Sequence, residues 1–433
     1  MPQNRIFPAC GMGASIRILP FVLIRMISNC KCPRSRVLFV LLGVLLLNLT
    51  FSARSQEAND SFFPLMAWDD VQDEATVQKM ADCGINVIAF VPTNMLYACD
   101  KYHVKAIVFD PLVTPNWDKP FASKPANEEL PKLIKAVNND PAVWGYHLKD
   151  EPDGNQFAEL GKSAELVRKL APGKWPYINL PPGMGGWYDT NYIDLFVKTC
   201  QPPIISYDNY AIGENVDFSY GFWANIWDVR DASLRNKVPF HTIVLTSAHF
   251  NYRIPTAADL RLQVYGSIVY GAKGIGYYKF CSKPLSILGA PDLGNFRMGP
   301  LDEFGEKTET WENLRNLNRQ IKNLSSVLLK LHSDDVYHVG DIPERNHGIT
   351  TNSLVKGLEA GTQFIIGEFT HEDGSRWVMI VNKDLKNSTF CRPTFRETYH
   401  HVQYLSPVTG KIAPFPSPWY ALAPGQAVLL KLE

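Results

Sequence analysis

The sequence predicts a (β/α)8 TIM barrel followed by a small antiparallel β-sandwich domain. From about residue 62, short apolar and β-branched runs alternate with amphipathic helical stretches, and the alternation repeats eight times in about 270 residues. Eight such units in that length are typical of a TIM barrel. A doubly wound open sheet is the alternative, but no glycine-rich phosphate-binding fingerprint follows the first apolar run, which ends Trp68-Asp69-Asp70.

Each predicted barrel strand is an apolar run of six to eight residues. These runs are residues 63–68, 85–91, 104–110, 143–149, 175–180, 204–210, 240–247 and 274–280. Between them, helical periodicity is found in stretches that include residues 74–83, 128–138, 157–170, 223–235 and 257–270, and a longer helix is expected over 308–331.

After residue 331 the pattern changes to alternation of apolar and polar residues. Residues 363–369 and 376–381 alternate in this way on either side of the turn Glu372-Asp373-Gly374, which predicts a β-hairpin. Further strands are expected over 402–405 and 427–430. We therefore assign residues 56–333 to the barrel domain and residues 334–433 to the β-sandwich domain.

The N-terminal segment differs from the rest of the chain in charge. The whole chain has 43 basic and 43 acidic residues, but residues 1–55 hold seven Lys or Arg and no Asp or Glu. The remainder is therefore mildly acidic, which argues against nucleic acid as a partner because phosphate binding needs a basic surface.

This segment has the features of an export signal. Lys31, Arg34 and Arg36 precede the apolar run of residues 37–47, and Ala53-Arg54-Ser55 is a small-x-small cleavage pattern. We expect residues 1–55 to be a signal peptide and the mature protein to be secreted or periplasmic, with no stable membrane insertion after cleavage. The apolar run is shorter than the ~20 residues that span a bilayer, although an uncleaved anchor is the alternative.

No metal or cofactor site is expected. After residue 55 the cysteines are Cys83, Cys99, Cys200, Cys281 and Cys391, an odd and scattered set without a CxxC pair or a histidine at ligand spacing. The chain also has no P-loop and no Gly-x-Ser-x-Gly nucleophile elbow.

Two adjacent carboxylates follow the fourth predicted strand. Asp150 and Glu151 stand where the strand opens into a loop, and Pro152 ends the strand. Catalytic groups of TIM barrels come from the C-terminal ends of the strands. Hydrolysis of a glycosidic bond needs one carboxylic acid to protonate the departing oxygen and a second carboxylate as nucleophile or base. Glu151 suits the acid role, and Asp150 suits a hydrogen bond to a sugar hydroxyl; a solvent-facing loop pair is the alternative.

On these residues the sequence resembles the (β/α)8 glycoside hydrolases of the large retaining clan that includes the family 42 β-galactosidases and the cellulase-like family 5. In that clan the acid/base Glu ends strand four, in some branches as Asp-Glu-Pro, which matches Asp150-Glu151-Pro152. Residues 270–278 and 301–308 are also similar to its β-galactosidase-type members. The resemblance covers roughly residues 62–331 and implies Glu151 as general acid/base.

The sequence departs from that clan at strand seven. The clan's nucleophile is a Glu at the end of this strand, but residues 243–250 contain no carboxylate. Asp208, at the end of strand six, is the best replacement as nucleophile or base, and Glu214 is a weaker one. Asp208 also fits a structural role in bonding loop amides.

Polar and aromatic residues at other strand ends are candidates to bind a sugar, because aromatic rings stack on sugar faces and polar groups bond hydroxyls. Each of them has packing as its alternative role. The substrate-binding candidates are Trp68, Asp69, Asp150, Asn179, Tyr210, His249, Arg253, Tyr278 and Lys279.

We therefore expect an exported glycoside hydrolase that cleaves O-glycosidic bonds of an oligo- or polysaccharide, with a carbohydrate substrate and no cofactor. A barrel that binds glycans without cleaving them is one alternative, motivated by the missing strand-seven carboxylate. A transglycosidase that uses the same residues is the other.

Overall fold

The computed structural model describes residues 62–114, 121–183, 191–282 and 296–433. The expected signal peptide, residues 1–55, lies outside these ranges. Within them, no helix combines the length and the apolar character needed to cross a membrane.

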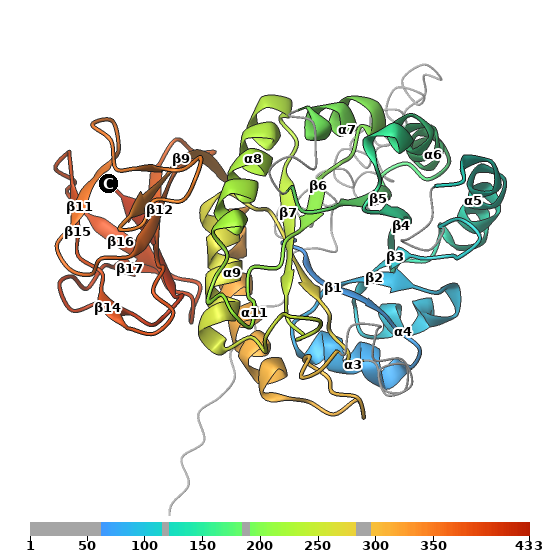
Figure 1. Cartoon of the computed structure of the whole chain (residues 1–433), viewed down its shortest axis with the longest axis horizontal. Coiled ribbons are helices and arrows are strands. Elements are labelled where there is room, and N and C mark those ends of the chain that lie inside the picture. The colour runs from blue at the N-terminus through green and yellow to red at the C-terminus, as the bar shows by residue number, and fades with distance from the viewer. Residues whose placement is uncertain (1–61, 115–120, 184–190, 283–295) are drawn as a thin grey trace, which may run out of the picture. The chain divides into compact units, whose positions relative to one another are not determined.

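Eight parallel strands close into a barrel, as predicted (Figure 1). Each strand pairs with its neighbour in chain order, and the eighth returns to the first through the register Leu65↔Ile275, which excludes an open sheet. The strands are β1 (Leu65–Asp70), β2 (Val87–Val91), β3 (Lys105–Val108), β4 (Val143–Asp150), β5 (Trp175–Leu180), β6 (Ile205–Asp208), β7 (Phe240–Leu245) and β8 (Ile275–Tyr278).

Helices connect successive strands and lie outside the barrel (Figure 1). Asp73 caps the first helix by accepting from the Thr76 amide, and Thr256 and Asp259 form a capping box at another. The helices are α3 (Glu74–Asp82), α4 (Leu96–Lys101), α5 (Ser123–Val137), α6 (Phe157–Leu170), α7 (Tyr192–Cys200), α8 (Tyr220–Asn236), α9 (Ala257–Val269) and α11 (Glu309–Leu328), with 3-10 turns η1 (Thr93–Met95) and η2 (Gly154–Gln156).

Two of these helices, α4 and α7, were not among those named from the sequence. They span six and nine residues. A helix of fewer than three turns places too few residues on one face to show a clear 3.6-residue period.

The C-terminal region forms a small β-sandwich. Its main sheet has seven strands in the order β10-β9-β12-β13-β19-β16-β17, and β11-β15 and β14-β18 form two smaller sheets. The pairs are antiparallel except for β9 with β10. The strands are β9 (Leu331–Val339), β10 (His347–Gly348), β11 (Val355–Leu358), β12 (Phe364–His371), β13 (Arg376–Asn382), β14 (Thr389–Phe390), β15 (Pro393–Phe395), β16 (Val402–Leu405), β17 (Ile412–Pro414), β18 (Ala421–Leu422) and β19 (Ala427–Leu432).

The predicted hairpin is confirmed as β12 and β13, which pair in the register Ile365↔Val381. The first strand of the sheet, β9, begins at Leu331, three residues before the start that we assigned to this domain.

The central strands β12, β13 and β19 of the main sheet are buried on both faces, and their two-residue period divides the side chains between two cores. Residues Ile365, Met379 and Leu429 belong to the hydrophobic core that includes the barrel and its helices. The next residue on each strand belongs instead to a second core within the β-sandwich: Ile366, Ile380 and Leu430. One face of the sheet therefore packs against the barrel and its helices, and the other face packs against the two smaller sheets.

Candidate active site

Three carboxyl groups meet at the C-terminal ends of the barrel strands. Asp150 is the last residue of β4, Glu151 follows it, and Asp208 is the last residue of β6. The carboxyl groups of Glu151 and Asp208 share a hydrogen bond. Asp208 is only 4% exposed, whereas Glu151 is exposed to solvent. The pair therefore consists of a buried residue, Asp208, and an exposed residue, Glu151, whose carboxyl group still lies among protein atoms.

The backbone at Glu151 is in the left-handed region, with φ of 46°. A residue with a Cβ rarely adopts this conformation, and such strain is concentrated at functional sites. The Glu151 amide donates to the Asn179 carbonyl oxygen of β5 at 2.9 Å. This bond attaches the first loop residue after β4 to the neighbouring strand, which fixes the point from which the Glu151 side chain extends.

Asn179 holds two of the three carboxyl groups. Its side-chain nitrogen donates to Asp208 Oδ1 at 2.8 Å and to Asp150 Oδ1 at 3.1 Å. Its side-chain oxygen accepts from the Ser206 hydroxyl at 2.9 Å, and Ser206 is itself bonded to Tyr177. Both of its amide hydrogens are therefore used by carboxyl groups, whose positions Asn179 fixes. Its predicted contact with substrate stays a prediction.

Burial raises the pKa of each carboxyl group in the cluster. The pKa of Asp150 is raised to about 7, first by burial and then by the charge of Glu151. The pKa of Asp208 is raised well above its usual range by burial and by the charges of Glu151 and Asp150. The nearby buried cation Lys149 lowers the pKa of Asp150 and Glu151, but less than burial raises it. Each carboxyl group of the cluster therefore keeps its proton to a higher pH than an exposed carboxyl group does, which suits a general acid.

Five aromatic residues pack together beside the carboxyl groups. We call this set the aromatic wall: Tyr210, His249, Tyr252, Tyr278 and Phe296. Tyr210 and Tyr278 are stacked, with ring centroids 5.0 Å apart and planes at 16°. His249 packs against Tyr252 at 4.8 Å and stacks on Phe296 at 4.8 Å. The tyrosines and Phe296 are half-buried, so each keeps part of its ring exposed. Three of the predicted substrate-binding residues, Tyr210, His249 and Tyr278, thus lie together next to the cluster.

The other predicted sugar-binding residues are engaged with protein groups. Trp68 is buried and packs edge-on against Phe90 at 4.7 Å, among barrel side chains that also include His147. Lys279 forms a buried ion pair with Asp69, which also accepts from the Cys281 amide at 2.7 Å.

Arg253 is engaged in the same way. It contacts the Asp259 carboxylate at 2.5 and 2.8 Å and donates to the Asp217 carbonyl oxygen. The structure thus gives Trp68, Asp69, Lys279 and Arg253 packing and ion-pair partners that the sequence alone did not predict.

No carboxylate takes the place of the clan's nucleophile after β7. Thr246 and Ser247 are buried there, and their hydroxyl groups donate to the backbone oxygens of Lys279 and Arg297. Glu214, the weaker candidate, is paired with Arg297 at 3.1 Å and is about half-exposed. Asp208 is therefore the second carboxyl group that the structure brings to Glu151.

No protein-family model matches the sequence, and no curated protein matches it. A glycoside hydrolase family 5 structure from Bacteroides vulgatus is similar at a TM-score of 0.55 and 13% identity, over 86% of this chain and 89% of that one. Another solved glycoside hydrolase matches at 0.50 and 13%, over 86% and 92%. A β-galactosidase from the psychrophilic Marinomonas ef1 matches at 0.49 and 11%, and the chain spans 62% of its length. The chain has the barrel fold of glycoside hydrolases.

Two members of the aromatic wall, Tyr252 and Phe296, were not predicted from the sequence. Tyr252 lies in the loop after β7, three residues beyond His249. This closeness in sequence to a predicted sugar-binding residue was the one signal that could have indicated Tyr252. Phe296 lies far along the segment after β8, where no pattern predicts the path of the chain. Among the described residues, no group of three or more His, Cys, Asp or Glu side chains is arranged to hold a metal ion.

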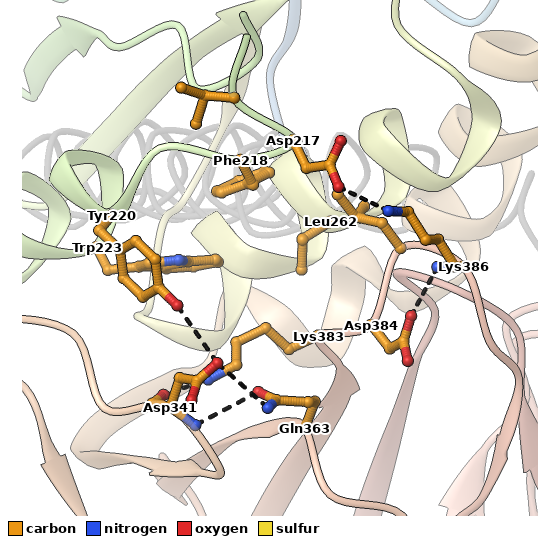
Figure 2. A pocket seen from close by; sticks show the side chains of 12 residues that line it. Asp217, Phe218, Tyr220, Trp223, Leu262, Asp341, Gln363, Lys383, Asp384 and Lys386 are labelled. Carbon is orange, nitrogen blue, oxygen red and sulfur yellow. Dashed lines mark hydrogen bonds and ion pairs between the residues drawn. The ribbon is translucent and has the colours of Figure 1, made fainter.

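A cavity of about 440 Å³ lies away from the carboxyl cluster, where the segment after β6 and the start of α8 meet the β-sandwich (Figure 2). Asp217 pairs with Lys386 across it at 2.8 Å, and Tyr220 donates to Asp341 at 3.3 Å. These polar groups bond one another across the junction of the two domains. The contacts are those of a domain interface, and we assign them no part in the chemistry.

Proposed function

We propose that this protein is a glycoside hydrolase that cleaves O-glycosidic bonds of an oligo- or polysaccharide, with Glu151 as general acid/base and Asp208 as its partner carboxyl group. The observation that carries the proposal is the hydrogen-bonded pair of Glu151 and Asp208 at the mouth of the barrel. The stacked rings of Tyr210 and Tyr278 beside the pair supply an aromatic surface for a sugar. The similarity in fold to a family 5 glycoside hydrolase agrees with this assignment.

In the proposed reaction, protonated Glu151 gives its proton to the glycosidic oxygen as the bond from that oxygen to the anomeric carbon breaks. With the single proton of the pair on Glu151, Asp208 is ionised, and its carboxylate attacks the anomeric carbon to form a glycosyl ester. Glu151, now ionised, takes a proton from water, and the water oxygen displaces Asp208 from the sugar. The product has the configuration of the substrate.

Retention fits the spacing of the pair better than inversion does. Retaining carboxyl groups lie about 5–5.5 Å apart and inverting ones about 6.5–9.5 Å apart, because an inverting enzyme places a water molecule between sugar and base. A hydrogen-bonded pair is closer than either. Asp208 is held by Asn179, whereas Glu151 is exposed. We infer that Glu151 moves away from Asp208 when the sugar enters. Glu151 would move a shorter distance to reach the separation of a retaining pair than to reach that of an inverting pair.

The charges around the site favour a neutral glycan. Lys279 and Arg253, which a uronic acid or sulfate group would need, are paired with Asp69 and Asp259. A polyanionic substrate would have to break these ion pairs while approaching the carboxyl cluster.

Glycan binding without cleavage is the second candidate function. The observation that favours it is the absence of a carboxylate in residues 243–250, where the clan has its nucleophile. A transglycosidase, which would transfer the glycosyl group from Asp208 to another sugar, uses the same groups as the hydrolase.

The test is hydrolysis of aryl glycosides and neutral oligosaccharides by the wild type and by Glu151→Gln and Asp208→Asn, with the product anomer followed by NMR. We expect both variants to lose at least 100-fold in kcat, as removal of a general acid or a nucleophile does. The control is Glu214→Gln, which removes a carboxylate of the neighbouring loop and is expected to keep wild-type activity.

Each of the other results identifies an alternative. A wild type that binds an oligosaccharide but cleaves nothing supports the binding function, and longer products support transfer. Wild-type activity in Glu151→Gln would refute the proposed mechanism.

We also propose that the protein is exported after cleavage of residues 1–55. The basic residues, apolar run and small-x-small pattern of that segment support this. Expression in a bacterial host with mass spectrometry of the mature chain should give an N-terminus at Gln56, and an intact N-terminus in the cell would contradict the proposal.

A further inference from the structure

A cavity of about 570 Å³ adjoins the barrel mouth at the ends of β1 and β8. Its floor includes the buried ion pair of Lys279 and Asp69. Its walls come from the start of α3 and from the turn at residues 301–305, which precedes α11. This volume lies within the range of about 300–1,000 Å³ that is common for ligand pockets.

The cavity and the carboxyl cluster lie at the same end of the barrel, the cavity at the ends of β1 and β8 and the cluster at the ends of β4 and β6. Lys279 in the cavity floor directly follows Tyr278, whose ring stacks on Tyr210 beside the cluster. The charges of Asp69 and of Glu151 both act on the Tyr278 hydroxyl, whose pKa burial raises above its usual range. Tyr278 is therefore close both to the floor of the cavity and to the proposed acid, and this is the observation that connects the two sites.

Phe304 stands at the edge of this cavity and is 81% exposed. The turn that carries it is held firmly, because the Phe304 and Glu306 amides donate to Asp302 Oδ1 at 2.9 and 2.8 Å. In addition, Lys79 of α3 donates to the Gly305 carbonyl oxygen at 2.6 Å. A single exposed apolar ring is common on protein surfaces, but Phe304 is held by a fixed turn at the edge of a pocket, where its ring is available to stack on a sugar.

The charge of the cavity defines the class of ligand. Of the described residues that line it, Lys279 is the one cation, and it is already paired with Asp69. Four further carboxylates, those of Asp70, Asp73, Asp302 and Glu303, also line it. Carboxylates accept hydrogen bonds from sugar hydroxyls and repel uronic acids and sulfates, so the lining favours a neutral sugar.

We propose that this cavity binds a further sugar unit of a neutral oligosaccharide whose scissile bond lies at Glu151 and Asp208, with the sugar ring stacked on Phe304. The inference rests on the proposed function and extends it, because it makes the substrate a neutral chain that occupies the mouth from the carboxyl cluster to Phe304.

The first test compares wild type and Phe304→Ala on neutral oligosaccharides of glucose, mannose and galactose, two to five units long. We expect the KM of the best pentasaccharide to rise about tenfold, the effect of losing one aromatic contact, with kcat retained and a smaller change for the disaccharide. The control is Tyr220→Ala, which removes an exposed ring from the other cavity (Figure 2) and should leave the kinetics as in wild type. Equal KM values for wild type and Phe304→Ala at every chain length would overturn the proposal.

The second test separates this inference from the proposed function. Calorimetry with Glu151→Gln measures binding of the same pentasaccharide without turnover, alone and combined with Phe304→Ala. Weaker pentasaccharide binding by the double variant than by Glu151→Gln alone supports the cavity site. If the wild type also hydrolyses nothing, the proposed reaction fails but the cavity site stands. Equal binding by both, or tighter binding of a uronic acid pentasaccharide than of the neutral one, refutes the cavity site.

Discussion

Glu151 and Asp208 share a hydrogen bond between their carboxyl groups at the mouth of the barrel. Two carboxyl groups in such contact hold one proton between them, because two adjacent negative charges repel each other. The Asn179 side-chain nitrogen donates to Asp208 Oδ1 at 2.8 Å and holds that carboxyl group in place. Glu151 is the exposed residue of the pair and is therefore the one that a substrate contacts first. This relationship leads to predictions about activity, and the packing of the chain leads to others about stability.

Activity should fall as the pH rises through the pKa of the carboxyl pair. The acid form is needed to protonate the leaving group, and the pKa of both Glu151 and Asp208 is raised, so the proton is lost at a higher pH than from an ordinary carboxyl group. A profile of kcat/KM against pH measures the alkaline limb. A limb at the usual pKa of a free glutamate, about 4.3, would contradict the assignment.

Replacing Asn179 with Ala should lower kcat by about 100-fold, because a misplacement of about 1 Å in a catalytic group has this effect. Since the hydrogen bonds from Asn179 lower the pKa of Asp208 and Asp150, their loss should also shift the alkaline limb to higher pH. Ser206→Ala removes the bonds of its hydroxyl group to the Asn179 oxygen and to Tyr177 but leaves both bonds from Asn179 to the carboxyl groups, so it should give a smaller change of the same sign. A variant with reduced kcat but an unshifted pH profile would show that Asn179 acts on the fold alone.

Asp150→Asn should stabilise the protein at alkaline pH. The pKa of Asp150 is raised to about 7 in the folded state from 3.8, so the folded protein holds a proton that the unfolded chain has lost. Stability therefore decreases as the pH rises from about 4 to about 7, and the full penalty remains above that. The gain in Tm on substitution should be larger at pH 8 than at pH 4.

The control for this experiment is Asp100→Asn, which changes an exposed carboxylate of α4. Calorimetric melting at both pH values checks the prediction. An equal gain for Asp150→Asn at pH 4 and pH 8 would mean that the effect is not electrostatic.

Gly367→Ala should destabilise the protein by about 1–3 kcal/mol, the usual effect of overpacking. A Cβ at Gly367 of β12 would overlap the carbonyl oxygen of Val269 at the end of α9, so the sheet and the helix would have to separate. Gly357→Ala in β11 meets only an ordinary contact with Thr394 at 3.8 Å and should change stability by less than about 0.5 kcal/mol. Denaturant unfolding of the two variants measures the difference, and equal values would refute the close packing.

Much of the fold could be predicted because its signals are local. The hairpin of β12 and β13 follows from a two-residue period on each side of Asp373-Gly374, and the strands of the barrel follow from short β-branched runs. The short helix α4 lacked such a signal, since six residues make less than two turns. The position of Glu151 was predictable too, because the end of a barrel strand is a fixed place in the fold.

The sequence by itself thus determined the alternation of strands and helices, the hairpin of the sandwich and the place of Glu151 after a strand, since each depends on neighbours within a few residues along the chain. Closure into a barrel rather than an open sheet depends on the pairing of β1 with β8. Only the tertiary structure decided which side chains are bonded to one another. Closure of the barrel brings Glu151 to Asp208 and pairs Lys279 with Asp69, 210 residues away. That pairing makes Lys279 part of the cavity floor and depends on strand register, which no local pattern encodes.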